Sequence, residues 1–173
     1  MVRHVKTHRA QRQTLLAVGE GKAEVAFLKH LKQLYCSGGN GVAVTIRNAH
    51  GKGPRNVIAT AIGASSSASY DKEVCLLDTD LEWTAKNKRD AQRKKIELVG
   101  STPCLEGLLL RILGKVIPRD SCASKQQLRG VTQKNMFETE DYVVDFSYVC
   151  LQSARLSIPE LETVLGLYEG KRD

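Results

Sequence analysis

Three short apolar runs, separated by segments with helical character, constrain the fold of this chain most strongly. The runs are TLLAVG at 14–19, GVAVTIRN at 41–48 and EVCLLD at 73–78. Between the first two, residues 22–35 carry apolar side chains at the three- and four-residue spacing of a helix, and NVIATAIGA at 56–64 is predicted to form another. Strands that alternate with helices pair in parallel, because each helix carries the chain back to the start of the next strand.

A basic segment and a further strand and helix extend this pattern. Residues 84–95 are predicted to form a helix, IELVG at 96–100 a strand, and 103–114 a helix with Pro103 in its first turn. Other helical segments are expected near 124–136 and 159–169. The sequence thus predicts an α/β domain with a mostly parallel central sheet, helices on both faces and a mainly helical C-terminal extension. We expect a basic N-terminal arm at 1–13, a core at 14–120 and an extension at 121–173 packed on the same domain.

Length and composition fit one globular domain. The chain has 173 residues, 42% of them hydrophobic, which suffices for a core without disulfides. Its five cysteines are scattered and form no C-x-x-C pair, as expected for reduced thiols. No apolar run approaches the ~20 residues of a membrane span, and the basic N-terminus lacks the apolar segment of a secretory signal. We therefore expect a cytoplasmic protein with no membrane partner; its oligomeric state is not predicted.

Positive charge indicates a polyanionic partner. The formal net charge is +7, and basic residues concentrate in the first dozen residues and in KNKRDAQRKK at 86–95. Such a surface attracts nucleic acid, DNA or RNA, although a solvated helix face would show the same run. The glycine-rich loop HGKGPRN at 50–56 adds two more cations. The candidate nucleic-acid-binding residues are Lys52, Arg55, Lys86, Lys88, Arg89, Arg93, Lys94 and Lys95.

Carboxylates follow two of the predicted strands. Glu20 comes directly after the first strand, and Asp78 and Asp80 stand at the end of the third, where residues two apart point to the same side. The carboxyl ends of parallel strands line the functional crevice of an α/β sheet. Neighbouring anions repel one another unless a cation or a shared proton intervenes. These three carboxylates therefore predict a site for a divalent cation.

Two more carboxylates are placed to reach the same crevice. Glu24 lies one helical turn after Glu20, and Glu106 lies near the start of the helix that follows the fourth strand. Carboxylate oxygens suit Mg²⁺, or Mn²⁺ in its place. The candidate metal ligands are therefore Glu20, Glu24, Asp78, Asp80 and Glu106.

Several segments resemble a known family. GEGKAEVAFLKHL resembles the first motif of Toprim domains, in which a glutamate closes the first strand, and CLLDTD resembles their Asp-x-Asp motif. GSTPCLEGLLLRIL is similar to the Ser-x-Pro-Cys-x-Glu segment of RloB-like proteins, a prokaryotic defence-associated branch of Toprim. GKGPRNVIATAI falls where that branch has a glycine-rich loop and helix. The resemblance spans residues 14–113 and implies a Toprim, Rossmann-like fold.

The resemblance implies a metal-dependent enzyme that cleaves phosphodiester bonds, an endonuclease related to the overcoming-lysogenization-defect nucleases. Glu20 would be a ligand or general base, Asp78 and Asp80 the central ligands, and Glu24 and Glu106 a second metal site. Glu20, Asp78 and Asp80 are thus the candidate catalytic residues. A protein partner from a defence system is also expected. Because only 5% of the residues are aromatic, we expect contacts to phosphate more than base stacking.

Other functions fit parts of the sequence. A catalytically silent Toprim-like module could bind nucleic acid or a protein partner, and a small-molecule phosphotransferase or phosphohydrolase could use the same carboxylates. Trp83 is expected to pack beside the site, with stacking on a base as the alternative. Cys104 is a candidate nucleophile near a helix start, although no base is paired with it in the sequence. Lys115 and Lys125 are equally placed for a catalytic lysine.

Overall fold

The computed structural model describes residues 12–37 and 41–170. Within these residues the chain forms four strands, seven α-helices and one 3-10 helix. The strands are β1 Thr14–Gly19, β2 Ala43–Asn48, β3 Lys72–Asp78 and β4 Ile96–Ser101. The helices are α1 Lys22–Cys36, α2 Gly53–Ser67, α3 Ala85–Arg93, α4 Leu105–Ile112, α5 Ser121–Thr132, η1 Thr139–Tyr142, α6 Tyr148–Ala154 and α7 Pro159–Glu169. The expected basic arm at 1–13 lies outside the described residues, apart from its last two positions.

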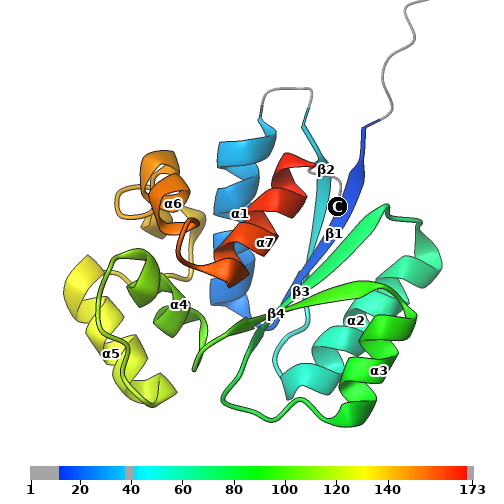
Figure 1. The fold of residues 1–173 in the computed structure, drawn as a ribbon, viewed down its shortest axis with the longest axis horizontal. Coiled ribbons are helices and arrows are strands. Elements are labelled where there is room, and N and C mark those ends of the chain that lie inside the picture. The colour runs from blue at the N-terminus through cyan, green and yellow to red at the C-terminus, as the bar shows by residue number, and fades with distance from the viewer. Residues whose placement is uncertain (1–11, 38–40, 171–173) are drawn as a thin grey trace, which may run out of the picture.

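The sheet is wholly parallel, with the strand order β2-β1-β3-β4. Helices α1 and α7 cover one face and helices α2 and α3 cover the other (Figure 1). Successive residues of β1 explain this layering, since Leu15 and Ala17 pack with α1 and α7 while Leu16 and Val18 pack with α2. A strand that is buried on both faces has apolar residues at successive positions of its sequence. The predicted α/β class, with helices on both faces, is confirmed.

The C-terminal helices pack on the same core as the sheet. Buried residues of α5, α6 and α7 belong to one cluster with α1 and α4. The Tyr168 hydroxyl of α7 donates a hydrogen bond of 3.1 Å to the carbonyl oxygen of Leu28 in α1. None of the helices in the described part of the chain is long and apolar enough to cross a membrane.

Three details differ from the sequence expectation. Pro103 lies before α4 and not in its first turn, because its carbonyl oxygen accepts the N–H groups of Thr79 (3.1 Å) and Asp80 (3.0 Å) and holds the chain against the loop after β3. Helix α5 begins at Ser121 and stops at Thr132, since Gln133 adopts a left-handed conformation with φ 58°. The short elements η1 and α6 were not expected. Between them lies VVDF at 143–146, in which Val143 and Val144 are exposed and Phe146 is buried.

Gly100 of β4 is required by close packing beneath the loop that follows β3. A Cβ atom there would lie 2.8 Å from Thr79 Cγ2 and 3.1 Å from the Trp83 ring. We expect Gly100→Ala to lower the free energy of unfolding by about 1–3 kcal/mol. Gly63→Ala is the matched control, because a Cβ at this exposed position of α2 meets nothing within 4 Å. Gly63→Ala should raise the free energy of unfolding by about 0.5–1 kcal/mol. Chemical denaturation of both variants tests the pair, and equal effects would contradict this packing.

Candidate active site

One cavity gathers most of the predicted carboxylates at the carboxyl edge of the sheet. Its volume is about 600 Å³, and Glu20, Glu24, Asp78 and Glu106 line it together with residues of α5 and of the loop that follows α5. We call it the acidic cavity. Asp80 is exposed and is not among its lining residues, although Asp80 lies close enough to affect the pKa of Asp78. Four of the five predicted metal ligands therefore line this cavity.

Backbone geometry at the ends of β1 and β3 fixes two of these side chains. Glu24 lies in the first turn of α1, and its Oε2 accepts the Gly21 N–H at 2.8 Å. Gly19 allows this approach, because a Cβ atom at that position would lie 2.8 Å from Glu24 Cβ. Asp78 Oδ1 accepts the N–H of Leu105, the first residue of α4, at 3.0 Å. Both carboxylates thus lie at helix starts, where the unpaired N–H groups favour negative charge.

The carboxylates of the acidic cavity repel one another. Burial, followed by the charges of Glu24, Glu20, Asp80 and Glu106, raises the pKa of Asp78 from 3.8 to about 8. Burial also raises the pKa of Glu24, and Glu106 and Glu20 add to that increase against two backbone hydrogen bonds that lower it. Without a cation, the cavity therefore favours a proton on Asp78 at neutral pH.

Lys125 brings a cation of the protein into this acidic environment. It lines the acidic cavity from α5, and its pKa is raised chiefly by Glu106, with smaller contributions from Cys104, Asp78 and Glu24. Burial opposes this increase. Lys115 is not among the lining residues of the acidic cavity. Of the two lysines that the sequence left open, the structure therefore brings Lys125 to the carboxylates.

Comparisons with protein-family models, curated proteins and solved structures give no match to this chain. Membership of the Toprim family and of its RloB-like branch stays a prediction. The fold and the chemistry of the acidic cavity are the observations from which function can be inferred.

The donor set of the acidic cavity fits a hard divalent cation in chemistry. Carboxylates have two oxygens each, so Asp78 and Glu24 keep capacity for a metal beside their hydrogen bonds to the backbone. Ser101, paired with Asp78 in the sheet, has a buried Oγ with no hydrogen-bond partner among the described residues. However, no three histidine, cysteine, aspartate or glutamate side chains in the described ranges already form a metal-binding group. Metal binding would require the carboxylates to converge further.

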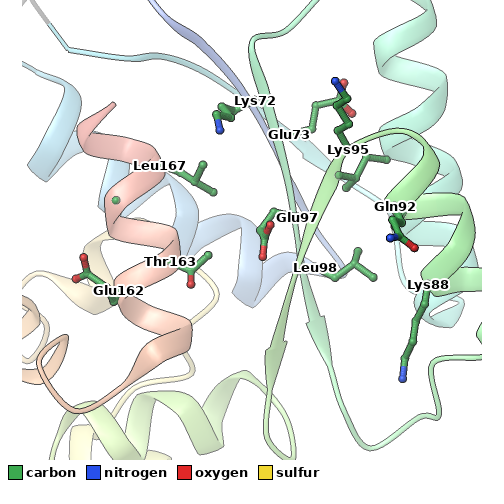
Figure 2. Close-up of a pocket in the computed structure, with 13 residues that line it drawn as sticks. Lys72, Glu73, Lys88, Gln92, Lys95, Glu97, Leu98, Glu162, Thr163 and Leu167 are labelled. Atoms are coloured by element: carbon green, nitrogen blue, oxygen red, sulfur yellow. The ribbon is translucent and has the colours of Figure 1, made fainter. Parts of the chain in front are cut away.

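The predicted basic residues lie on or beside α2 and α3, the helices that cover the sheet face opposite α1. Lys52, Arg55 and Lys86 line a second cavity of about 690 Å³ between α2 and α3. Lys88 and Lys95 line a third cavity, of about 880 Å³, beside the edge strand β4. Figure 2 shows both lysines on the α3 side of β4, with α7 on the other side. The remaining three, Arg89, Arg93 and Lys94, are exposed, and none of the eight lines the acidic cavity.

The surroundings of Cys104 and Trp83 decide between the two roles that the sequence left open for each. Cys104 is fully buried, and burial together with Glu106 raises its pKa to about 12, so its thiol is not an activated nucleophile. Trp83 is half-buried and packs beside Gly100, and its Nε1–H donates to the carbonyl oxygen of Asp78 at 3.0 Å. Trp83 therefore supports the end of β3, as the packing alternative expected.

The C-terminal extension contributes further cations and an aromatic residue to the acidic cavity, and of these only Lys125 was a candidate from the sequence. Besides Lys125, the acidic cavity is lined by Arg129, Lys134 and Phe137. The Ser121 hydroxyl, at the start of α5, donates to Asp80 Oδ2 at 2.7 Å. No spacing in the sequence marks these residues, because α5 and its following loop reach the strand ends only through tertiary packing.

Proposed function

We propose that this chain is a metal-dependent phosphodiesterase that cleaves nucleic acid, an endonuclease of the Toprim, RloB-like kind acting in prokaryotic defence. One observation carries the proposal: carboxylates from the ends of β1 and β3 and from the first turns of α1 and α4 line a single cavity. Burial and the repulsion between these carboxylates, which together raise the pKa of Asp78, favour a cation as the resident partner. DNA and RNA are both candidate substrates.

The carboxylates would have different roles in binding metal and accepting a proton. Asp78 and Asp80 would hold Mg²⁺ or Mn²⁺, and Glu24 and Glu106 would hold a second ion or orient the first. When bound, such a metal polarises a phosphate oxygen and lowers the pKa of a bound water. Glu20, which lines the cavity directly after β1, would complete the coordination or accept a proton from the attacking water.

Other side chains of the cavity would position the substrate. Lys125 is held protonated by the neighbouring carboxylates and would contact a phosphate oxygen while offsetting the negative field of the site. The Ser121 hydroxyl and the Leu105 N–H would keep Asp80 and Asp78 in fixed orientations through their hydrogen bonds.

A catalytically silent binding module is the second candidate. It is favoured by the absence of a preformed metal-binding group among the described residues and by the ammonium of Lys125 in the acidic cavity, which could serve as a structural counterion. Incubation of plasmid, single-stranded DNA and RNA with the protein, in Mg²⁺, Mn²⁺ or EDTA, distinguishes the two. Metal-dependent cleavage supports the enzyme, and binding without cleavage supports the module.

The cations of the second cavity provide a separate prediction. We expect a Lys52→Ala, Arg55→Ala double variant to bind nucleic acid roughly 10-fold more weakly at low salt, because both side chains would contact phosphates. The slope of log affinity against log salt should fall by roughly 2. The control is Lys29→Ala with Lys115→Ala, two exposed lysines outside the three cavities described. Equal losses in both double variants would indicate general electrostatic attraction.

A further inference from the structure

Phe137 is an aromatic side chain left in solvent at the acidic cavity. It is 53% exposed and lines the cavity together with Glu20, Glu24 and Asp78. Single exposed apolar residues are common on protein surfaces, so exposure alone has no functional meaning. Its position at the cavity and the way its loop is held are what set this residue apart.

The loop that carries Phe137, residues 133–138, is fixed by hydrogen bonds. Asp141 Oδ2 accepts the N–H of Phe137 at 3.1 Å and the N–H of Glu138 at 3.2 Å. The Asp141 carbonyl oxygen accepts Lys134 Nζ at 3.2 Å. Two of these contacts hold the loop by its backbone and one by the Lys134 side chain, and none of them uses the phenyl ring.

A second anchor ties the same loop to the carboxylates. The buried Tyr142 hydroxyl lies 3.0 Å from the carbonyl oxygen of Met136 and 3.0 Å from that of Ala23. Ala23 directly precedes Glu24 in α1. Met136 itself is buried in a left-handed conformation with φ 60°, which turns the chain so that its neighbour Phe137 stays outside. The position of the Phe137 ring relative to the acidic cavity is thus fixed by its loop.

Three cations line the same cavity as the Phe137 ring. Lys125 and Arg129 line it from α5, and Lys134 lines it from the loop that follows. A nucleotide has an anionic phosphate and a flat aromatic base, which match this pairing of cations with an exposed ring. A cavity of about 600 Å³ has the size of a small-molecule site, enough for a single nucleotide. Bases within a duplex are already stacked on their neighbours and cannot offer a free face.

We propose that Phe137 is a stacking platform for an unpaired base, so that the acidic cavity takes single-stranded nucleic acid in preference to duplex. If the protein cleaves nucleic acid, this preference would determine its substrate, and in that form the inference rests on the proposed function. The preference of the protein for binding single strands over duplex does not depend on cleavage, and it is measured in EDTA. A deoxyribose and a ribose strand present the same base face, so DNA and RNA strands are tested in parallel.

The test uses oligonucleotides that carry 2-aminopurine, whose fluorescence is quenched when it stacks, and measures affinity in EDTA for single strands and a matched duplex. For Phe137→Leu we expect about 10-fold weaker single-strand binding and loss of the protein-induced quenching, with duplex binding unchanged. Phe137→Trp should retain both. Leu156→Ala, an exposed apolar residue outside the acidic cavity, is the control and should match wild type. Circular dichroism melting verifies the fold of each variant.

The outcomes separate this inference from the proposed function. Single-strand preference and quenching that depend on Phe137, without cleavage in Mn²⁺, would support the stacking site and contradict the nuclease. Cleavage by wild type and Phe137→Leu at equal rates, with equal single-strand affinity, would contradict the stacking site and leave the nuclease standing. Failure of the wild-type protein to bind either strand type, or equal loss on single strand and duplex in Phe137→Leu, would also overturn the inference.

Discussion

An Asp78→Asn variant is expected to lose metal-dependent cleavage, with a rate at least about 100-fold below that of the wild type. Asparagine keeps an oxygen that can accept the Leu105 N–H, so the connection between β3 and α4 is preserved. It removes the negative charge that a divalent cation needs at the centre of the acidic cavity. The measurement is the initial rate of cleavage of the best substrate in Mg²⁺ and in Mn²⁺, with circular dichroism to verify the fold.

Glu97→Gln is the matched control for this substitution. Glu97 is an exposed carboxylate of β4 that lines the cavity beside the sheet edge and not the acidic cavity (Figure 2). The same loss of one negative charge there should leave the cleavage rate unchanged. A wild-type rate in Asp78→Asn, or an equal loss in Glu97→Gln, would contradict the assignment of Asp78 as a metal ligand.

The metal-free protein is expected to become less stable as the pH rises from about 4 to about 8. The pKa of Asp78 is near 3.8 when the chain is unfolded and about 8 in the folded state. Between these values the folded protein keeps a proton that the unfolded chain has released, so the free energy of unfolding falls with increasing pH. The slope from this one group is at most about 1.4 kcal/mol per pH unit, and it levels off above the folded-state pKa.

Chemical denaturation between pH 5 and 9 in EDTA measures this dependence. Asp78→Asn should show a flatter profile than wild type and higher stability at the alkaline end, because it removes a buried negative charge and the repulsion that this charge experiences. Mg²⁺ or Mn²⁺ should stabilise the wild type most at high pH, where Asp78 is ionised, and should not stabilise the variant. Identical profiles in the two proteins would show that neither burial nor the neighbouring carboxylates raise the pKa of Asp78 in the folded protein.

The sheet and its acidic edge could be predicted because local patterns determine them. A strand buried on both faces needs a continuous apolar run, and Leu15, Leu16 and Val18 supply one in β1. Parallel pairing then brings the residues after β1 and β3 to one edge, which places Glu20 and Asp78 in the same cavity. Helical spacing added Glu24 correctly, since α1 begins directly after β1.

Features that depend on the C-terminal extension could not be predicted in the same way. Lys125 and Phe137 reach the acidic cavity because α5 and its loop pack against α4 and α1, and side-chain spacing along the sequence does not determine that packing. The start of α4 was misplaced because the Pro103 carbonyl pairs with the distant Asp80 N–H, a long-range contact that overrides the usual preference of proline for a first turn.

Isothermal titration of Mg²⁺ and Mn²⁺ into the wild-type protein and into Asp78→Asn tests the central claim most directly. The acidic cavity as a metal site predicts saturable binding to the wild type and none to the variant, with both proteins folded. Equal binding by both proteins, or no binding by either at millimolar metal, would contradict it and would leave the acidic cavity as a cluster neutralised by protons and by Lys125.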